Sequence, residues 1–190
     1  IVQDLKDFSR VDQADRQPSA LNAALESTLN VVANEIKYKA EVVLELGEIP
    51  QVDCVPAQIN QVFMNLLVNA AQAIPERGKI IVRSGLENNH VWFEIEDTGK
   101  GMSAEIQQRI FEPFFTTKKH GEGSGLGLSV VYGIVRRHHG AILLQSEPGQ
   151  GSVFSVLLPH LDATTLADVA PSPAPTPSRG HHIMVVDDEE

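Results

Sequence analysis

The 190-residue sequence has few cysteines, few basic residues and no long apolar run. Its single cysteine, Cys54, excludes an internal disulfide framework and a cysteine-rich zinc site, and its apolar surroundings predict a buried side chain. Lys and Arg total 15 against 25 Asp and Glu, so the formal net charge of -10 argues against nucleic acid or an anionic membrane as the main partner. No run of eighteen apolar residues occurs, and the first ten residues do not have the pattern of a signal peptide. We therefore expect a cytoplasmic chain without membrane contact of its own, and leave open whether a longer parent protein is membrane-anchored.

Hydrophobic periodicity predicts one α/β domain. The first predicted helix of this domain follows an N-cap at Ser19 and has an apolar stripe of leucines and Val32. Three more helices are predicted, over 56–74, 103–110 and 124–138. Five strands are predicted, over 41–46, 79–85, 90–96, 141–146 and 152–158, and the second and third of them form a hairpin.

Composition divides the chain into four parts. Residues 1–10 have helical spacing and are expected to be the end of a longer helix. Residues 11–160 are the predicted α/β domain. Residues 161–180 are rich in Ala and Pro and predict an extended linker. Residues 181–190 return to an apolar strand pattern that ends in acids.

Two asparagines lie four residues apart in the predicted helix over 56–74. Asn65 and Asn69 therefore point the same way within an otherwise apolar helix. Such amides need partners, either in a packed interface or in a ligand. An amide oxygen is a suitable ligand for Mg²⁺, and an amide NH₂ can donate to phosphate.

A carboxylate and two glycines follow the strand over 90–96, in the sequence DTGKGM. This segment is either a tight turn or a base-binding loop. Asp97 only accepts hydrogen bonds when ionised, so it suits the exocyclic amino group of adenine and would repel the carbonyl of guanine. Gly99 and Gly101 allow the backbone to approach a flat base closely, next to Met102.

Glycines also lead into the predicted helix over 124–138, in the sequence GEGSGLGL. Backbone amides at a helix N-terminus form an anion site. The pattern fits neither the Rossmann nor the Walker loop. Before it, FEPFFTTKK contains Phe111, Phe114 and Phe115, which suit a loop held by aromatic side chains against a core. Thr116, Thr117, Lys118 and Lys119 then offer donors and cations, or else form a solvated basic turn.

Taken together, QVFMNLLVNA, DTGKGM, FEPFFTTK and GEGSGLGL, followed by GQGSVFSVLLP, resemble the N, G1, F and G2 boxes of bacterial sensor histidine kinase catalytic domains. These belong to the GHKL superfamily, and the resemblance covers roughly residues 19–160. It is nearest to the nitrogen-regulation-like and hybrid kinases. The resemblance implies an α/β two-layer sandwich of the Bergerat type, with a mixed, mostly antiparallel sheet, helices on one face and a flexible ATP lid.

The resemblance also implies the ligands and the residue roles. ATP and Mg²⁺ would be the cofactors, with Asn69 as the metal ligand, Asp97 on adenine, and Asn65 and Lys118 as catalytic residues at the phosphates. The full set of expected nucleotide contacts is Asn65, Asn69, Asp97, Gly99, Gly101, Met102, Phe115, Thr116, Thr117, Lys118, Gly123, Ser124, Gly125, Leu126, Gly127 and Leu128.

The ends of the chain imply partners by the same resemblance. Residues 1–10 resemble the end of a dimerisation and phosphotransfer domain. Residues 181–190 resemble the first strand of a receiver domain, where Asp187 and Asp188 would help to bind magnesium. None of the seven histidines has the helix, acid and proline context of a phosphoacceptor. The phosphoacceptor is therefore expected on the missing dimerisation domain, with a receiver domain or response regulator downstream.

Two departures and two alternatives complete the interpretation. Relatives often have a basic residue at the position of Gln72, so we expect phosphate charge to rest on Lys118 and the metal. GHKL ATPases carry a glutamate four residues before the magnesium asparagine as a base for water, and this chain has Asn65 there. This favours phosphoryl transfer over a GHKL-type ATPase. The second alternative is a nucleotide-binding interaction module without transfer activity.

Overall fold

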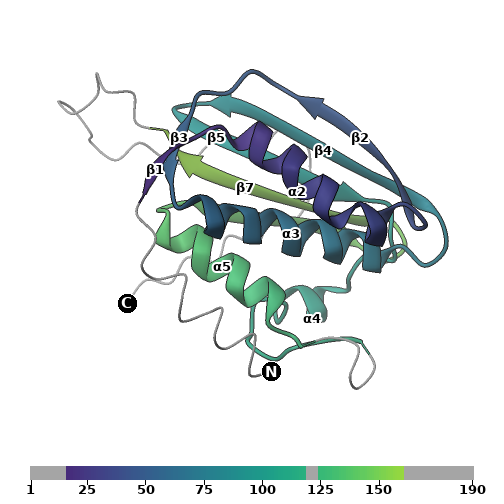
Figure 1. Cartoon of the computed structure of the whole chain (residues 1–190). Coiled ribbons are helices and arrows are strands. Elements are labelled where there is room, and N and C mark those ends of the chain that lie inside the picture. The colour runs from purple at the N-terminus through teal and green to yellow at the C-terminus, as the bar shows by residue number, and fades with distance from the viewer. Residues whose placement is uncertain (1–15, 119–123, 161–190) are drawn as a thin grey trace.

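The fold is a two-layer α/β sandwich, seen in a computed structural model that describes residues 16–118 and 124–160 (Figure 1). The sheet order is β2-β4-β5-β7-β6, in which β2 pairs with β4 in parallel and the other pairs are antiparallel. This confirms the predicted mixed, mostly antiparallel sheet. The strand bounds are β2 (Ala40–Leu46), β4 (Gly78–Glu87), β5 (His90–Asp97), β6 (Ala141–Glu147) and β7 (Gly151–Pro159).

Three helices cover one face of the sheet (Figure 1). They are α2 (Leu21–Ile36), α3 (Pro56–Ala73) and α5 (Gly127–Arg137). Buried and partly exposed residues alternate along β5, because only one face of the sheet packs against the helices. Phe63 of α3 and Phe93 of β5 meet edge to face at the centre, with ring centroids 4.6 Å apart.

A buried histidine joins α5 to the start of α3. The ring of His138 follows the last turn of α5, with Nε2 accepting from the backbone N–H of Val55 at 3.1 Å and Nδ1 lying 2.9 Å from Ile134 O. Burial is the main cause that lowers the pKa of His138, so the ring is neutral here. Nearby Cys54 is a buried free thiol, as predicted.

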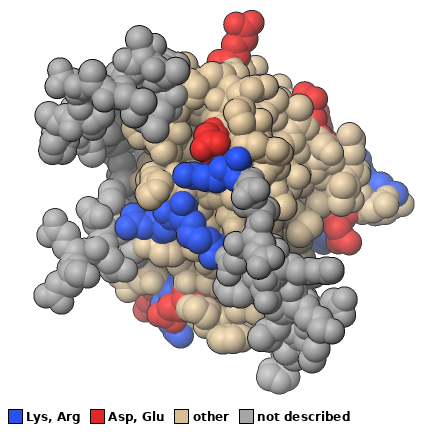
Figure 2. Space-filling view, turned by 60° about the vertical axis from the view of Figure 1, so that its left-hand side comes forward, with Lys and Arg blue, Asp and Glu red and all other residues tan. Residues whose placement is uncertain are grey.

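Although the formal net charge is -10, some of the basic side chains lie together on the surface. Arg136 and Arg137 lie in the last turn of α5, where their positive charge complements the helix dipole. Lys and Arg side chains gather near the middle of the face shown in Figure 2. An ion pair joins Arg16 to Asp53, with the nitrogen and oxygen 4.0 Å apart.

One prediction at the start of the domain is wrong, and two short strands there were not predicted. Ser19 is not the N-cap of α2; the cap position is Ala20, without a side-chain cap bond. Ser19 instead ends a short strand, β1 (Gln17–Ser19), which pairs antiparallel with β3 (Val52–Cys54). The Ser19 hydroxyl donates to Gln17 O at 3.1 Å within β1 and does not cap α2.

Two predicted helices are shorter in the structure. The helix over 103–110 is reduced to α4 (Ala104–Gln107), and turns follow it. The helix over 124–138 begins only at Gly127, because Gly125 has a φ of +67°, which no right-handed helix contains. The predictions for residues 1–10, 161–180 and 181–190 lie outside the described residues.

Candidate nucleotide site

A cavity of about 730 Å³ lies between the helix layer and one end of the sheet. Its size is typical of small-molecule sites. Side chains from α3, the β5–α4 loop, the 115–118 segment and the start of α5 line it. The lining residues are Lys39, Asn65, Asn69, Gln72, Ala73, Asp97, Lys100, Gly101, Met102, Ile106, Ile110, Phe115, Thr116, Thr117, Lys118, Ser124, Gly125, Gly127, Leu128, Ser152 and Phe154.

The two asparagines of α3 face the N-terminus of α5. A Cβ added to Gly127 would lie 3.6 Å from Asn65 Oδ1 and 3.8 Å from Asn69 Nδ2, so all three residues meet at one wall. Both asparagines are half-buried. Among the described residues, neither side-chain amide has a hydrogen-bond partner, so both are available to a ligand. Together with the first backbone amides of α5, they form a donor-rich wall suited to an anion.

Asp97 forms another wall of the cavity, at the end of β5. Only 3% of this residue is exposed, and its Oδ1 accepts a 2.8 Å hydrogen bond from the backbone N–H of Gly99. Burial raises the pKa of Asp97 to about 6, and hydrogen bonds from the backbone of Gly99 and Ser152 oppose that rise. The carboxylate is therefore mostly ionised at neutral pH and can accept a hydrogen bond from a ligand.

Three lysines line the cavity, and the sequence motifs indicated only Lys118 among them. Lys118 Nζ donates to Gln72 Oε1 of α3. Burial, followed by the nearby charge of Lys100, lowers the pKa of Lys118. Lys100 lies in the predicted base-binding loop, so its place in the motif could have indicated it. Lys39 precedes β2, outside every motif, and no local pattern indicated it.

The aromatic segment is anchored differently from the prediction. Phe111 packs on Tyr132 of α5 with centroids 5.5 Å apart, and the Arg109 guanidinium lies 4.4 Å from the Phe115 ring centroid. Phe114 is 75% exposed, so the expectation that it holds the loop against the core is wrong. Its φ of +67° turns the side chain outward while its N–H donates to Gly125 O at 3.0 Å.

Most of the sequence-predicted contacts line this one cavity. Gly99 and Leu126 do not: Gly99 packs against the backbone of Ala73, where a Cβ would come within 2.6 Å, and Leu126 is the N-cap residue of α5. Gly123 lies outside the described residues. The thirteen others are at the cavity: Asn65, Asn69, Asp97, Gly101, Met102, Phe115, Thr116, Thr117, Lys118, Ser124, Gly125, Gly127 and Leu128.

Few of the described side chains at the cavity can act as an acid or a base. Among the described residues that line it, Asp97 is the sole carboxylate and no histidine is present. The described part of the chain also contains no group of three His, Cys, Asp or Glu side chains able to hold a metal ion. The amide oxygens of Asn65 and Asn69 nevertheless fit Mg²⁺, which binds few protein ligands and takes the rest from phosphates and water.

The fold and the cavity together define the chain as a two-layer α/β nucleotide-binding domain, with a carboxylate and an amide pair on different walls of one cavity. A family profile described as "Histidine kinase-, DNA gyrase B-, and HSP90-like ATPase" matches residues 54–162, more than half of the chain. The chain belongs to this family and is an ATP-binding catalytic domain of the histidine kinase type.

Named sensor kinases are among its relatives. Sensor kinase CckA of Brucella abortus (strain 2308) is 45% identical over 129 residues, 60% of this chain and 14% of that protein. Signal transduction histidine-protein kinase AtoS of Escherichia coli (strain K12) is 36% identical over 162 residues, 84% of this chain and 26% of that protein. The chain therefore spans only a small part of these relatives.

A solved structure supports the same family. The catalytic domain of histidine kinase ThkA superposes with a TM-score of 0.69 at 30% identity, covering 76% of this chain and 95% of that one.

No helix in the described ranges is both long enough and apolar enough to span a bilayer.

Proposed function

We propose that this chain binds Mg-ATP in the cavity and donates its γ-phosphoryl group to a histidine on a dimerisation and phosphotransfer domain. The observation that carries the proposal is the arrangement of the walls. A buried carboxylate, Asp97, lies at the end of β5, and two half-buried amides, Asn65 and Asn69, face the N-terminus of α5.

This arrangement gives the nucleotide a direction. Asp97 would accept the exocyclic amino group of adenine, because an ionised carboxylate has no proton to donate and would repel the guanine carbonyl. The phosphates would lie at the start of α5, where backbone amides and Asn65 donate to them. Lys118 and Lys100 would supply positive charge along the phosphates. When bound, Mg²⁺ would neutralise part of the phosphate charge, with Asn69 as its protein ligand.

The lining residues favour transfer over hydrolysis. Transfer breaks the bond between the γ-phosphorus and the bridging oxygen, forms a bond to the histidine nitrogen and releases ADP. The acceptor nitrogen carries its own lone pair, so the cavity has to position ATP and does not have to deprotonate water. Hydrolysis requires a base for water, whereas position 65 carries an amide and the cavity's carboxylate among the described residues is held by Gly99 on the adenine side.

The wider assignments belong to the same proposal. Residues 1–10 would be the end of the dimerisation helix, 11–160 the ATP-binding domain, 161–180 a linker and 181–190 the start of a receiver domain. The partners would be the dimerisation domain and a receiver domain or response regulator, as in a hybrid kinase of the nitrogen-regulation-like subgroup. Because its substrate would be ATP, the domain would work in the cytoplasm.

The test is to mix the chain with a separately purified dimerisation and phosphotransfer domain of the same kinase, Mg²⁺ and γ-labelled ATP. We expect acid-labile label on the acceptor histidine, and loss of that label with Asn69→Ala. Release of free phosphate without label on the acceptor would contradict the proposal and indicate a GHKL-type ATPase. Binding of ATP with neither labelled histidine nor free phosphate would contradict the proposal and indicate a nucleotide-binding module without transfer activity.

A further inference from the structure

The base-binding loop after β5 is held by side chains outside it. Met102, which lines the cavity, donates its backbone N–H to Ser146 Oγ at 2.9 Å. The side chain of Gln107 in α4 then donates to two carbonyl oxygens, Met102 O at 2.9 Å and Ser146 O at 2.8 Å. Gln107 thus bridges the loop to the end of β6 while both backbone groups of Met102 are satisfied.

Ser146 connects this bridge to the strand that carries the partner of Asp97. Its hydroxyl lies 2.8 Å from Gly151 O and 3.0 Å from Ser152 Oγ. Because a hydroxyl has one proton, it donates to one of these groups while accepting from Met102. Ser152 pairs with Asp97 in the sheet, so Ser146 links the backbone of Met102 to the same residue of β7 that pairs with Asp97.

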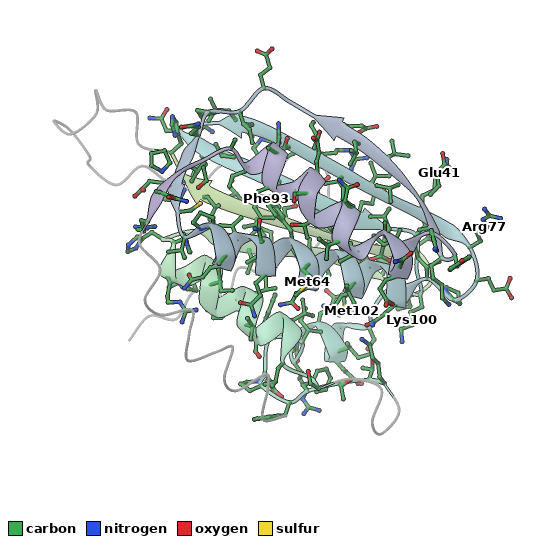
Figure 3. The ribbon with its side chains drawn as sticks, in the orientation of Figure 1. Glu41, Met64, Arg77, Phe93, Lys100 and Met102 are labelled. Atoms are coloured by element: carbon green, nitrogen blue, oxygen red, sulfur yellow. The ribbon has the colours of Figure 1, made fainter. Side chains whose placement is uncertain are left out.

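Close backbone contacts hold the part of the loop that precedes Met102. A Cβ added to Gly101 would come within 1.8 Å of Glu147 O, and one added to Gly151 within 1.9 Å of Asp97 O. The backbone N–H of Gly149 also donates to Lys100 O at 2.7 Å. Figure 3 shows Lys100 and Met102 beside the C-terminal end of α3, next to the helix that carries the amide pair.

We propose that Gln107 and Ser146 are positioning residues for base selection. They fix Met102 against the β6–β7 turn and so set the gap between Met102 and Asp97 into which the base fits. This rests on the proposed function, since it requires that the cavity takes an adenine nucleotide. Without the two hydrogen bonds of Gln107, Met102 relaxes, the purine shifts relative to Asp97, and discrimination at position 6 of the purine is lost.

The test uses Gln107→Leu, which keeps a similar volume but removes both donors. Gln108→Leu is the matched control, because Gln108 is the neighbouring exposed residue of the same segment and makes no side-chain hydrogen bond within the described ranges. Calorimetry gives Kd values for ATP and for inosine triphosphate, which carries a carbonyl where adenine carries its amino group. Thermal unfolding is followed in parallel.

We expect Gln107→Leu to raise the Kd for ATP by about 5- to 10-fold, as loss of one or two hydrogen bonds implies, while the Kd for inosine triphosphate changes little. The preference for ATP then falls by the same factor, and Gln108→Leu leaves it unchanged. Ser146→Ala, which removes the acceptor for Met102, should lower the preference in the same direction and serves if Gln107→Leu does not fold.

Two other results have distinct meanings. If the wild-type chain binds ATP but the variants lower only the unfolding temperature and keep the wild-type preference, Gln107 and Ser146 are merely structural and the inference is overturned. If the wild-type chain does not bind ATP, the proposed function itself fails, and the inference fails with it.

Discussion

At the scale of single residues, the site depends on where charge is placed and where it is left out. Asp97 is a buried carboxylate with a raised pKa, whereas Asn65, on another wall of the cavity, carries a neutral amide. The Lys118 ammonium donates to the side chain of Gln72 in α3, so a positive charge lies beside this helix although residue 72 itself is neutral. Among the described residues that line the cavity, Asp97 is thus the only carboxylate.

Base binding should depend on pH through Asp97. Its pKa of about 6 lies above the ordinary aspartate value of 3.8, so the carboxylate is ionised above about pH 7 and takes up a proton as the pH falls below 6. Protonation removes an acceptor, so the Kd for adenosine should be constant at neutral pH and rise up to about 10-fold per pH unit below 6. Adenosine is the ligand because it has no phosphate to titrate.

The control for this pH dependence is Asp97→Asn. Its Kd should be about 10- to 100-fold higher than the wild-type value at neutral pH, as loss of a charged hydrogen bond implies, and should not change between about pH 5 and pH 8 by titration of residue 97. A wild-type Kd that stays flat across this range would rule out Asp97 as the group that receives the base.

Replacement of Lys118 should act on the phosphates alone. We expect Lys118→Ala to raise the Kd for ATP by about 10-fold, the size of one charge-assisted hydrogen bond, and to leave the Kd for adenosine unchanged. Lys119→Ala is the matched control and should have a smaller effect. Equal effects of the two variants on ATP binding, or a larger effect of Lys119→Ala, would contradict the role given to Lys118.

At the scale of elements, the long periodic segments could be predicted and the short ones could not. Pro56 at its start and Pro75 after its end predict the bounds of α3 to within one residue. The hairpin of β4 and β5 follows from alternation on either side of Asn88 and Asn89. Both asparagines of that turn have positive φ, as a tight hairpin turn requires.

The elements that were missed depend on contacts between distant residues. β1 and β3 have three residues each and exist because they pair with each other across more than thirty residues of chain, which no local period reveals. In the site, the amide pair and Asp97 were predictable because their motifs are local. Lys39, which reaches the cavity from outside all motifs, could be placed only by the tertiary fold.

Two glycines should respond oppositely to alanine. Gly133 lies within α5 with nothing within 4 Å of an added Cβ, so Gly133→Ala should raise the free energy of unfolding by about 0.5–1 kcal/mol through helix propensity. Gly101 has a φ of +62° and its Cβ would meet Glu147 O, so Gly101→Ala should lower it by more than about 2 kcal/mol. Urea unfolding measures both, and a destabilised Gly133→Ala would contradict the open packing of α5 there.

At the scale of the whole molecule, an apolar core holds the helices on the sheet, and the buried ring of His138 joins the end of α5 to Val55, the residue before α3. The pKa of His138 is lowered, chiefly by burial and also by the charges of Arg16 and Arg137. The unfolded chain therefore binds a proton more readily than the folded one, and stability is lost on the acid side.

Urea unfolding against pH tests this link. The contribution of His138 should be fully present above 6.5, the ordinary pKa of a histidine in an unfolded chain, and be lost as the pH falls below that value. The experiment uses an Asp97→Asn background, because the raised pKa of Asp97 has the opposite effect on stability. Adding His138→Gln removes the titrating ring, so the pH-dependent loss should become smaller; an unchanged slope would show that other groups cause it.

The central claim is that this cavity holds ATP with its base on Asp97 and its phosphates at the start of α5. The most direct measurement is a crystal structure of the chain with Mg²⁺ and a non-hydrolysable ATP analogue. We predict the exocyclic amino group within hydrogen-bond distance of the Asp97 carboxylate, and the phosphates beside Gly127, Asn65 and Asn69. A nucleotide bound in the reverse direction, or outside this cavity, would contradict the account.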